Sequence, residues 1–389
     1  MTINLFDDNA WASLRPLSFT RPVADLRVGI LTIAQKWERH LNATAGFHTI
    51  PYLSVKFPAQ PTANLSINGS VCPDEGLLEA IDRLRDGEAL KQQDLLIAYR
   101  ASGAGVIPEY AAELKPVAYE AALIRILHPE DIFKNNDGEL RKDFSLLTKG
   151  RSSTILSSTN VILGEQVFVE EGGGAECATL NSLTGPVYIG KNSQIWEGAH
   201  IRGSFALCHD SQVKMGAKIY GQTTIGPFSR VGGEINNAVI WGYSSKGHEG
   251  YLGNSVMGQW CNIGADSNNS NLKNNYADVK IWDYTMEGLR ETGMLFCGMI
   301  MADHAKCGIN TMFNTGSVVG VGANVFGAGF PKTFLPDFSW GGAQGFETYR
   351  LYKMFETAEQ VFKRRNLPFD EVERNILTAV FELTKSYRS

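Results

Sequence analysis

One histidine has surroundings that suit acid–base chemistry. His248 is preceded by Gly247 and followed, after Glu249, by Gly250. An imidazole titrates near neutral pH, so it can take a proton from an amine that must be neutral before it attacks an acyl group. A lone histidine is more often structural, but flanking glycines leave space and permit unusual backbone angles. From these residues alone both interpretations stay open for His248, a structural histidine and a general base that carries little packing.

A second set of candidate residues lies near the N-terminus. Asp7 and Asp8 are adjacent carboxylates of the kind that bind Mg²⁺. Arg15, Arg21 and Lys36 are cations that could bind the phosphates of a nucleotide. Residues 6–13 contain no glycine, so a glycine-rich loop that cradles a triphosphate is not expected there. The alternative is a degenerate domain that is kept for packing or regulation.

The elements that position His248 are predicted by a six-residue repeat. An aliphatic residue recurs at every sixth position, and a mostly small residue follows four positions later. The repeated aliphatic residues are Ile189, Ile195, Ile201, Leu207, Val213, Ile219, Ile225 and Val231. Each hexad makes a short strand and a turn, and three hexads close one triangular coil with the aliphatic side chains inside. The pattern predicts a left-handed parallel β-helix of hexapeptide repeats over residues 151–330.

The repeat is interrupted once, at residues 268–296, by a polar and asparagine-rich segment. A loop of this length is usually functional. We expect it to reach toward a neighbouring β-helix or over an acyl pocket, and we expect its deletion to spare the fold. We expect residues 331–389 to form a C-terminal helical segment, with amphipathic helices at 349–364 and 370–387 that cap the open end of the β-helix.

Residues 1–150 lack hexads, and helical and strand patterns alternate there. This alternation predicts a small α/β domain with a partly parallel sheet. The expected helices are residues 30–41 and 77–90, and the expected buried strands are residues 94–101 and 121–127.

Composition excludes several classes of protein. The chain has 389 residues, 43% of them hydrophobic, and a net charge of −5, so it is neither disordered nor an expected partner of nucleic acid or of an anionic membrane. Its six cysteines form no CxxC pair, which argues against a disulfide framework. His200 and His209 lie half a coil apart, which argues against a metal ion between them. No apolar stretch is long enough to span a bilayer and the first residues are acidic, so we expect a cytoplasmic protein.

Residues 246–271, KGHEGYLGNSVMGQWCNIGADSNNSN, resemble the acetyltransferase half of the GlmU family. The residues that carry the resemblance are Gly247-His248, Tyr251-Leu252-Gly253-Asn254, Asn262-Ile263-Gly264-Ala265 and Asn271. The sequence after Asn271 looks more like the alternative bacterial and archaeal-type branch, which has a longer insertion. The segment RPLSFTRPVADLRVG resembles the start of a sugar nucleotidyltransferase domain, here in a truncated form.

The resemblance implies a bifunctional transferase of UDP-N-acetylglucosamine biosynthesis, a precursor of the cell wall. It implies acetyl-CoA as acyl donor, an amino-sugar phosphate as acceptor and a nucleotide as further substrate. It also implies His248 as the base and Asn262 beside it in the catalytic set. Asn262 and Asn271 would hold the sugar and its amine, and Tyr251 would meet the phosphate. Family active sites lie between neighbouring subunits, so we expect a homotrimer.

Two departures from the family pattern leave alternatives open. The family lysine about twelve residues before the histidine is replaced by Asn236-Asn237. Lys246, Lys273 or Lys280 could supply its charge, and Arg230 is a further candidate for the sugar phosphate. In the N-terminal domain Val23 occupies a lysine position. The rival interpretations are a sugar-phosphate nucleotidyltransferase whose β-helix only assembles the oligomer, and a non-catalytic scaffold or ligand sensor.

Overall fold

The structure is a computed structural model that describes residues 1–102, 111 and 113–388. The chain divides into two compact units, one of Met1–Arg27 and Leu31–Asp131 and one that contains Val28–Ile30 and the chain from Ile132 onward. Segment 28–30 belongs to the second unit because its backbone amides donate to α5 (Asn136–Thr148): Gly29 to Asn136 and Ile30 to Asp143, each at 2.8 Å. The division therefore falls earlier than the boundary expected at residue 150.

The first unit is a mixed sheet with the strand order β2-β1-β3-β5-β4-β6. Strand β1 pairs in parallel with β2 and β3, and β5 is antiparallel to both of its neighbours. Its strands are β1 (Thr2–Phe6), β2 (Thr44–His48), β3 (Leu65–Asn68), β4 (Glu88–Gln92), β5 (Leu95–Arg100) and β6 (Lys115–Ala118). Its helices are α1 (Ala10–Ser13), η1 (Val23–Asp25), α2 (Ile33–Leu41) and α3 (Glu75–Asp82). The predicted α/β class is confirmed.

Local predictions in this unit were right where capping signals agreed with the periodicity. Helix α2 begins after Thr32, whose hydroxyl accepts from the amide of Gln35 while the Gln35 side chain accepts from the amide of Thr32. The predicted strand at 94–101 is β5. The prediction of one helix over 77–90 was wrong beyond Asp82, where α3 ends, and β4 begins at Glu88. Residues 121–127 make only an isolated bridge between Val71 and Arg125.

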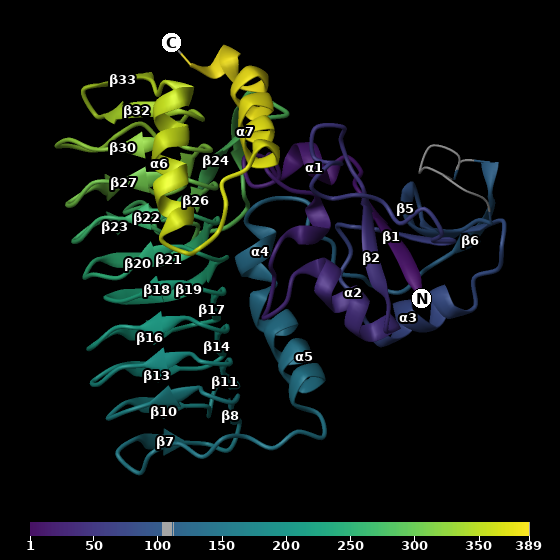
Figure 1. Cartoon of the computed structure of the whole chain (residues 1–389), viewed down its shortest axis with the longest axis horizontal. Helices are drawn as coiled ribbons and strands as arrows, with labels where there is room; N and C mark the ends of the chain where they lie inside the picture. The colour runs from purple at the N-terminus through teal and green to yellow at the C-terminus, as the bar shows by residue number, and fades with distance from the viewer. Residues whose placement is uncertain (103–110, 112, 389) are drawn as a thin grey trace. The chain divides into compact units, whose positions relative to one another are not determined.

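The second unit contains the β-helix predicted from the hexads, with stacked parallel strands along three faces (Figure 1). The first face has β7 (Val161–Leu163), β10 (Thr179–Asn181), β13 (His200–Arg202), β16 (Lys218–Tyr220), β23 (Asn268–Asn269) and β28 (Met312–Phe313). The second has β8 (Val167–Val169), β11 (Val187–Ile189), β14 (Phe205–Leu207), β17 (Thr223–Ile225), β26 (Ile300–Met301), β29 (Val318–Val319) and β31 (Phe334–Leu335). The third has β9 (Gly174–Ala175), β12 (Gln194–Ile195), β15 (Gln212–Val213), β18 (Arg230–Val231), β20 (Ser245–Lys246), β22 (Asn262–Ile263), β27 (Lys306–Cys307), β30 (Asn324–Val325) and β32 (Ser339–Gly342).

The interior of the β-helix is a stack of the repeated aliphatic side chains. Ile195, Val213 and Val231 occupy one column, and each is at most 1% exposed. Burying one such side chain stabilises the fold by about 1.5–3 kcal/mol. Since a single coil buries little by itself, the stability of each coil depends on its neighbours.

The coil that precedes His248 is shorter than the others. Gln212 pairs with Arg230 eighteen positions later, but Arg230 pairs with Ser245 after only fifteen. The missing residues come from a corner: β19 (Glu234–Ile240) and β21 (Tyr251–Met257) run straight from the first face into the second. This change of register alters which residues of the following segment point inward.

One corner of the β-helix carries residues with positive φ that are not glycine. In successive coils these are Asn192, Asp210, Phe228, Tyr243, Trp260 and His304, with φ between 55° and 63°. The aromatic members stack, with ring centroids 4.9 Å apart for Phe228 and Tyr243 and 4.2 Å apart for Tyr243 and Trp260. Such ring contacts contribute about 0.5–1.5 kcal/mol beyond their buried area, which offsets part of the cost of left-handed backbone.

The insertion at 268–296 does not match the projecting polar loop expected from its composition. Strands β24 (Lys280–Asp283) and β25 (Gly288–Glu291) form an antiparallel hairpin. Val279, Ile281 and Tyr284 are at most 3% exposed, and the Tyr284 hydroxyl donates to the carboxylate of Asp337 at 2.7 Å. The Trp282 ring stacks on Phe334 of β31 with centroids 4.2 Å apart. The hairpin therefore packs against the C-terminal coils of its own chain.

Helices flank the β-helix within this unit: α4 (Asp131–Lys134), α5, α6 (Leu351–Lys363), α7 (Glu371–Leu383) and η3 (Lys385–Tyr387). Helix α6 and the following helix confirm the predicted C-terminal helical segment, and β33 (Gly345–Thr348) precedes them. The Phe362 ring of α6 lies on Trp260 with centroids 4.0 Å apart, which fixes the helix against the aromatic corner. No helix in the described part of the chain has the length and apolar character needed to cross a membrane.

Candidate active site

His248 lies in the turn between β20 and β21, at the end of the shortened coil. Its side chain is exposed and makes no hydrogen bond or ion pair with any residue that the structure describes. Its backbone carbonyl accepts a hydrogen bond from the Lys246 ammonium at 2.6 Å. The imidazole is thus accessible, while the buried Lys246 ammonium holds the backbone of the turn that carries it. This arrangement suits a proton acceptor.

Tyr251 and two asparagines form a hydrogen-bonded group three residues after His248. The Asn271 amide donates to the Tyr251 hydroxyl at 2.9 Å and to the Asn254 side-chain oxygen at 2.8 Å. A Cβ at Gly253 would overlap the Tyr251 ring, so this glycine provides the space in which the ring lies. The structure thus brings together three residues of the sequence motif that come from β21 and from the start of the insertion.

Lys246 is not the surface cation that the sequence suggested. It takes the register position of Val231, inside the β-helix, and is 2% exposed. Burial lowers the pKa of Lys246 to about 8, while Glu249 and Cys307 favour its charged form. The shortened coil explains the error, because it moves Lys246 into the inward column. Its charge cannot meet a substrate phosphate at the surface in this arrangement.

Lys246→Met should raise the free energy of unfolding by about 1–3 kcal/mol at pH 7, because one pKa unit corresponds to about 1.4 kcal/mol. A lowered lysine pKa means that the unfolded chain binds the proton more tightly, so the charge destabilises the fold below pH 8. The gain should shrink as the pH rises from about 8 toward 10.5. Urea unfolding at several pH values measures it, with exposed Lys191→Met as the control. A loss of stability at pH 7 would contradict this prediction.

The other two lysines suggested for the sugar phosphate are engaged in the insertion. The Lys273 ammonium donates to the carbonyl of Asp278 at 2.7 Å. Lys280 forms an ion pair with Glu291 across the hairpin at 3.0 Å. Neither contacts the group formed by Tyr251, Asn254 and Asn271 in the described part of the chain.

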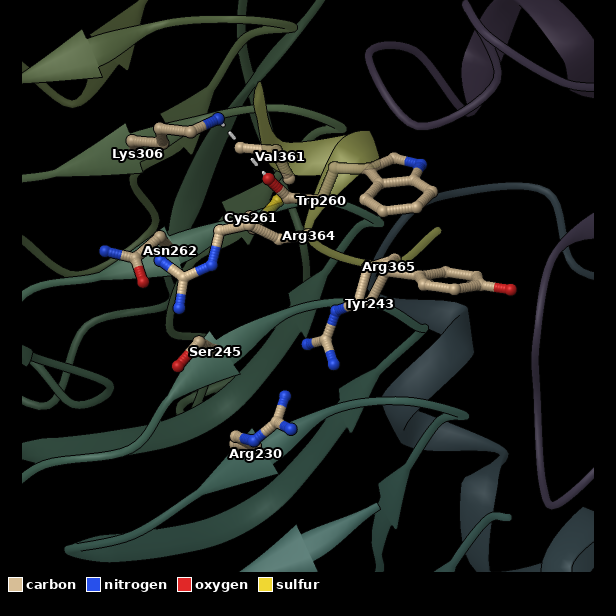
Figure 2. Close-up of a pocket in the computed structure, with 10 residues that line it drawn as sticks. All are labelled: Arg230, Tyr243, Ser245, Trp260, Cys261, Asn262, Lys306, Val361, Arg364 and Arg365. Atoms are coloured by element: carbon tan, nitrogen blue, oxygen red, sulfur yellow. Dashed lines mark hydrogen bonds between the residues drawn. The ribbon is translucent and has the colours of Figure 1, made fainter. Parts of the chain in front are cut away.

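Asn262 and Arg230 line a separate cavity of about 490 Å³ on the third face of the β-helix (Figure 2). Strands β18, β20, β22 and β27 supply one side, and the end of α6 supplies the other. Its lining residues are Arg230, Tyr243, Ser245, Trp260, Cys261, Asn262, Lys306, Val361, Arg364 and Arg365. Ser245 lies three residues before His248, so the cavity and the histidine belong to the same coil. The sequence analysis missed Lys306, Arg364 and Arg365. The only local signal is the pair of adjacent arginines, Arg364 and Arg365, at the end of the helix expected over 349–364.

The carboxylates of Asp7 and Asp8, in the first unit, already accept hydrogen bonds from several protein donors. The Asp7 carboxylate accepts from the amide of Val23 at 2.8 Å and from the hydroxyl of Thr49 at 2.6 Å, and burial raises its pKa to about 7. The Asp8 carboxylate accepts from Arg125 at 2.6 Å and from Asn68 at 2.9 Å. A guanidinium in this position competes with a cation, so the residues do not suit the Mg²⁺ site that was expected. The described residues contain no group of three or more His, Cys, Asp or Glu side chains placed to hold a metal ion.

The cations expected to bind a nucleotide differ in their exposure. Lys36 is 1% exposed, and Arg21 is 5% exposed with an ion pair to Asp25 at 2.9 Å. Arg15 is partly exposed, with its guanidinium 4.4 Å from the centre of the Trp11 ring. Binding through Arg21 or Lys36 therefore requires these side chains to move.

Arg125 is a candidate that sequence reasoning missed. Its guanidinium contacts Asp8, Asn9 at 2.6 Å and Ser70 at 3.2 Å, at the carboxyl ends of β1 and β3. Ligands of open α/β sheets bind at this edge. The signal in the sequence is a single arginine within the apolar run at 121–127.

Comparisons with known proteins support the expected N-terminal domain and show a similarity to GlmU proteins over about half of the chain. Residues 3–152 match the family model described as sugar nucleotidyl transferase. Two bifunctional GlmU proteins, from two strains of Thermus thermophilus, are each 28% identical over 239 residues, which covers 54% of this chain and 49% of the relative. The chain thus spans about half the length of the curated relatives it matches.

Solved structures of low identity also align. An N-acyltransferase from Bacillus cereus, AntD, is 13% identical with a TM-score of 0.22 and covers 54% of this chain and 87% of its own. An Arabidopsis UDP-N-acetylglucosamine acyltransferase is 16% identical with a TM-score of 0.21 and covers 61% of this chain and 97% of its own. At these TM-scores the two structures carry no argument about the fold or the function of this chain. The chain is thus similar to GlmU proteins over about half of its length, and a domain similar to sugar nucleotidyl transferases precedes its parallel β-helix.

Proposed function

We propose that the β-helix transfers an acetyl group from acetyl-CoA to the amine of an amino-sugar phosphate, with His248 as the general base. The observation that carries this proposal is that an accessible His248 imidazole is followed, three residues later in the chain, by the hydrogen-bonded group of Tyr251, Asn254 and Asn271. These residues belong to the segment that resembles the GlmU acetyltransferase motif.

The chemistry follows from the side chains available. The amine nitrogen attacks the thioester carbonyl, a C–N bond forms, and the C–S bond breaks. His248 takes the proton that the nitrogen loses and passes it to the departing thiolate, so that the products are the amide and free CoA. The amide groups of Asn271 and Asn254 and the Tyr251 hydroxyl can hold polar groups of the sugar near this base. Asn262, on the neighbouring face, is proposed to contact the acceptor as well.

Two further parts of the proposal concern assembly and the first unit. The homotrimer implied by the family stays a prediction, as does nucleotide binding by the first unit. Arg15 and Arg125 are the cations we propose for that binding, because their guanidinium groups are partly exposed.

The direct test is an assay for free CoA thiol with purified protein, acetyl-CoA and glucosamine-1-phosphate. Glucosamine and glucosamine-6-phosphate serve as comparison acceptors. We expect thiol release that requires both the acceptor amine and its phosphate. Release that occurs equally without acceptor, or no release with any amino sugar, would refute acyl transfer and leave the nucleotidyltransferase and scaffold interpretations.

A further inference from the structure

The cavity between the third face and α6 has an unusual balance of charge. Figure 2 shows the guanidinium groups of Arg230, Arg364 and Arg365 converging on the same space, beside Ser245 and Asn262. The Lys306 ammonium lies at the edge and donates to the carbonyls of His304 at 2.9 Å and Trp260 at 3.4 Å. No carboxylate is among the lining residues.

The three guanidinium groups lack anionic partners within the described chain. None of the hydrogen bonds or ion pairs among residues 1–102, 111 and 113–388 joins their side chains to a carboxylate. The three cations share one space in Figure 2, and burial together with the charges of Arg230 and Arg364 lowers the pKa of Arg365. Like charges that share a small space without a counterion repel one another, and this repulsion opposes folding. A bound anion would remove this cost.

We propose that this cavity binds a ligand that carries two or more linked phosphate groups. A single phosphate has a charge of about −1.5 to −2 at neutral pH and cannot balance three guanidinium groups and an ammonium, whereas a diphosphate comes close. Each guanidinium offers a planar fork of donors that matches phosphate oxygens. The cavity volume of about 490 Å³ leaves room for more than the phosphates, with Tyr243 and Trp260 as an aromatic wall.

The positions of the arginines give this ligand a structural effect. Arg364 and Arg365 follow the last turn of α6, whereas Arg230 comes from β18. Phosphates held by both sets therefore bridge the helix and the β-helix, in addition to the contact between Phe362 and Trp260. The ligand should slow amide hydrogen exchange in α6. This inference does not depend on the acyl transfer proposed above.

Isothermal titration of the full chain with inorganic pyrophosphate tests the proposal, with orthophosphate and sulfate as comparison anions. We expect pyrophosphate to bind at least about tenfold more tightly than either comparison anion. The double variant Arg364→Gln/Arg365→Gln and the single variant Arg230→Gln should each weaken pyrophosphate by about tenfold or more. The matched control is Lys363→Gln, because Lys363 is an exposed cation at the same helix end that does not line the cavity.

Linked phosphates occur in both nucleoside diphosphates and CoA, so UDP and CoA are titrated in parallel. Tighter binding of one of them than of pyrophosphate identifies the source, and equal binding of all three shows that the diphosphate alone is recognised. The proposal is overturned if pyrophosphate binds no better than sulfate, or if Lys363→Gln weakens binding as much as the arginine variants do. His248→Ala should retain full pyrophosphate binding, which separates this test from that of the proposed reaction.

Discussion

His248→Ala should lower the rate of acetyl transfer by at least about 100-fold, because a positioned base typically contributes about 10²–10⁴-fold to such a step. The same change should alter the free energy of unfolding by no more than about 0.5 kcal/mol, since the side chain is exposed and makes no hydrogen bond or ion pair with any described residue. The combination of a large kinetic effect and a small effect on stability distinguishes a catalytic role from a structural one. Initial rates of thiol release and urea unfolding measure the two quantities.

The matched control for this variant is His200→Ala, which removes an exposed histidine from β13 on the same β-helix. We expect its rate to stay within about twofold of the unchanged protein. Equal losses of rate in the two variants would point to a general effect of surface substitution. A His248→Ala variant that releases thiol at the normal rate would remove this residue from the mechanism, whatever its effect on folding.

Tyr284→Ala should destabilise the protein by about 3–5 kcal/mol, the usual cost of removing a large buried aromatic side chain. Tyr284 is 3% exposed, its hydroxyl donates to the buried Asp337, and its ring contacts Phe334 and Tyr387. The variant also leaves the Asp337 carboxylate without this donor, which adds to the cost. Equilibrium unfolding in urea provides the measurement.

Tyr276→Ala is the comparison, because Tyr276 lies in the same insertion but is 69% exposed. It should change the stability by less than about 0.5 kcal/mol. If Tyr284→Ala were equally mild, the hairpin would be a detachable surface element, as its composition first suggested. The structure predicts the opposite, and deletion of the whole hairpin should therefore unfold the C-terminal coils.

The β-helix was predictable because its signal is local and repeated. An inward aliphatic residue and a small corner residue recur at fixed spacing, and each coil obeys the same packing rule as the next. The hairpin was not predictable in this way, since its buried side depends on partners far along the chain. Ile281 and Tyr284 become core only when Phe334, Asp337 and Tyr387 pack against them. The polar composition of the insertion reflects its exposed residues and gives no sign that one side of the hairpin is buried.

The candidate site was predictable only in part, for two physical reasons. Tyr251 and Asn271 come together because β23 lies beside β21, where the Gly253 amide donates to the Asn269 side chain, and this follows from the motif's place in the repeat. Lys246 was misplaced because a shortened corner changes the register from eighteen residues to fifteen. Arg364 and Arg365 join Arg230 across more than a hundred residues, and nothing in the local sequence links them.

The hairpin lengthens one coil of the β-helix, and this bears on the order in which the coils fold. Most coils return after about eighteen residues, but Asn262 meets its partner Lys306 only after forty-four. Closing the longer loop costs about 0.8 kcal/mol more in chain entropy than closing an ordinary coil. The coil that follows the hairpin docks on β21, β22 and β23, which precede the hairpin in the chain. Each coil before Ile263 can thus add to the preceding coil after a short loop closure, whereas the coil that contains Lys306 adds only after the chain has closed across the whole insertion. We therefore expect the addition of coils to be slower at this step, and until it is complete the last coil before the insertion exposes its apolar edge.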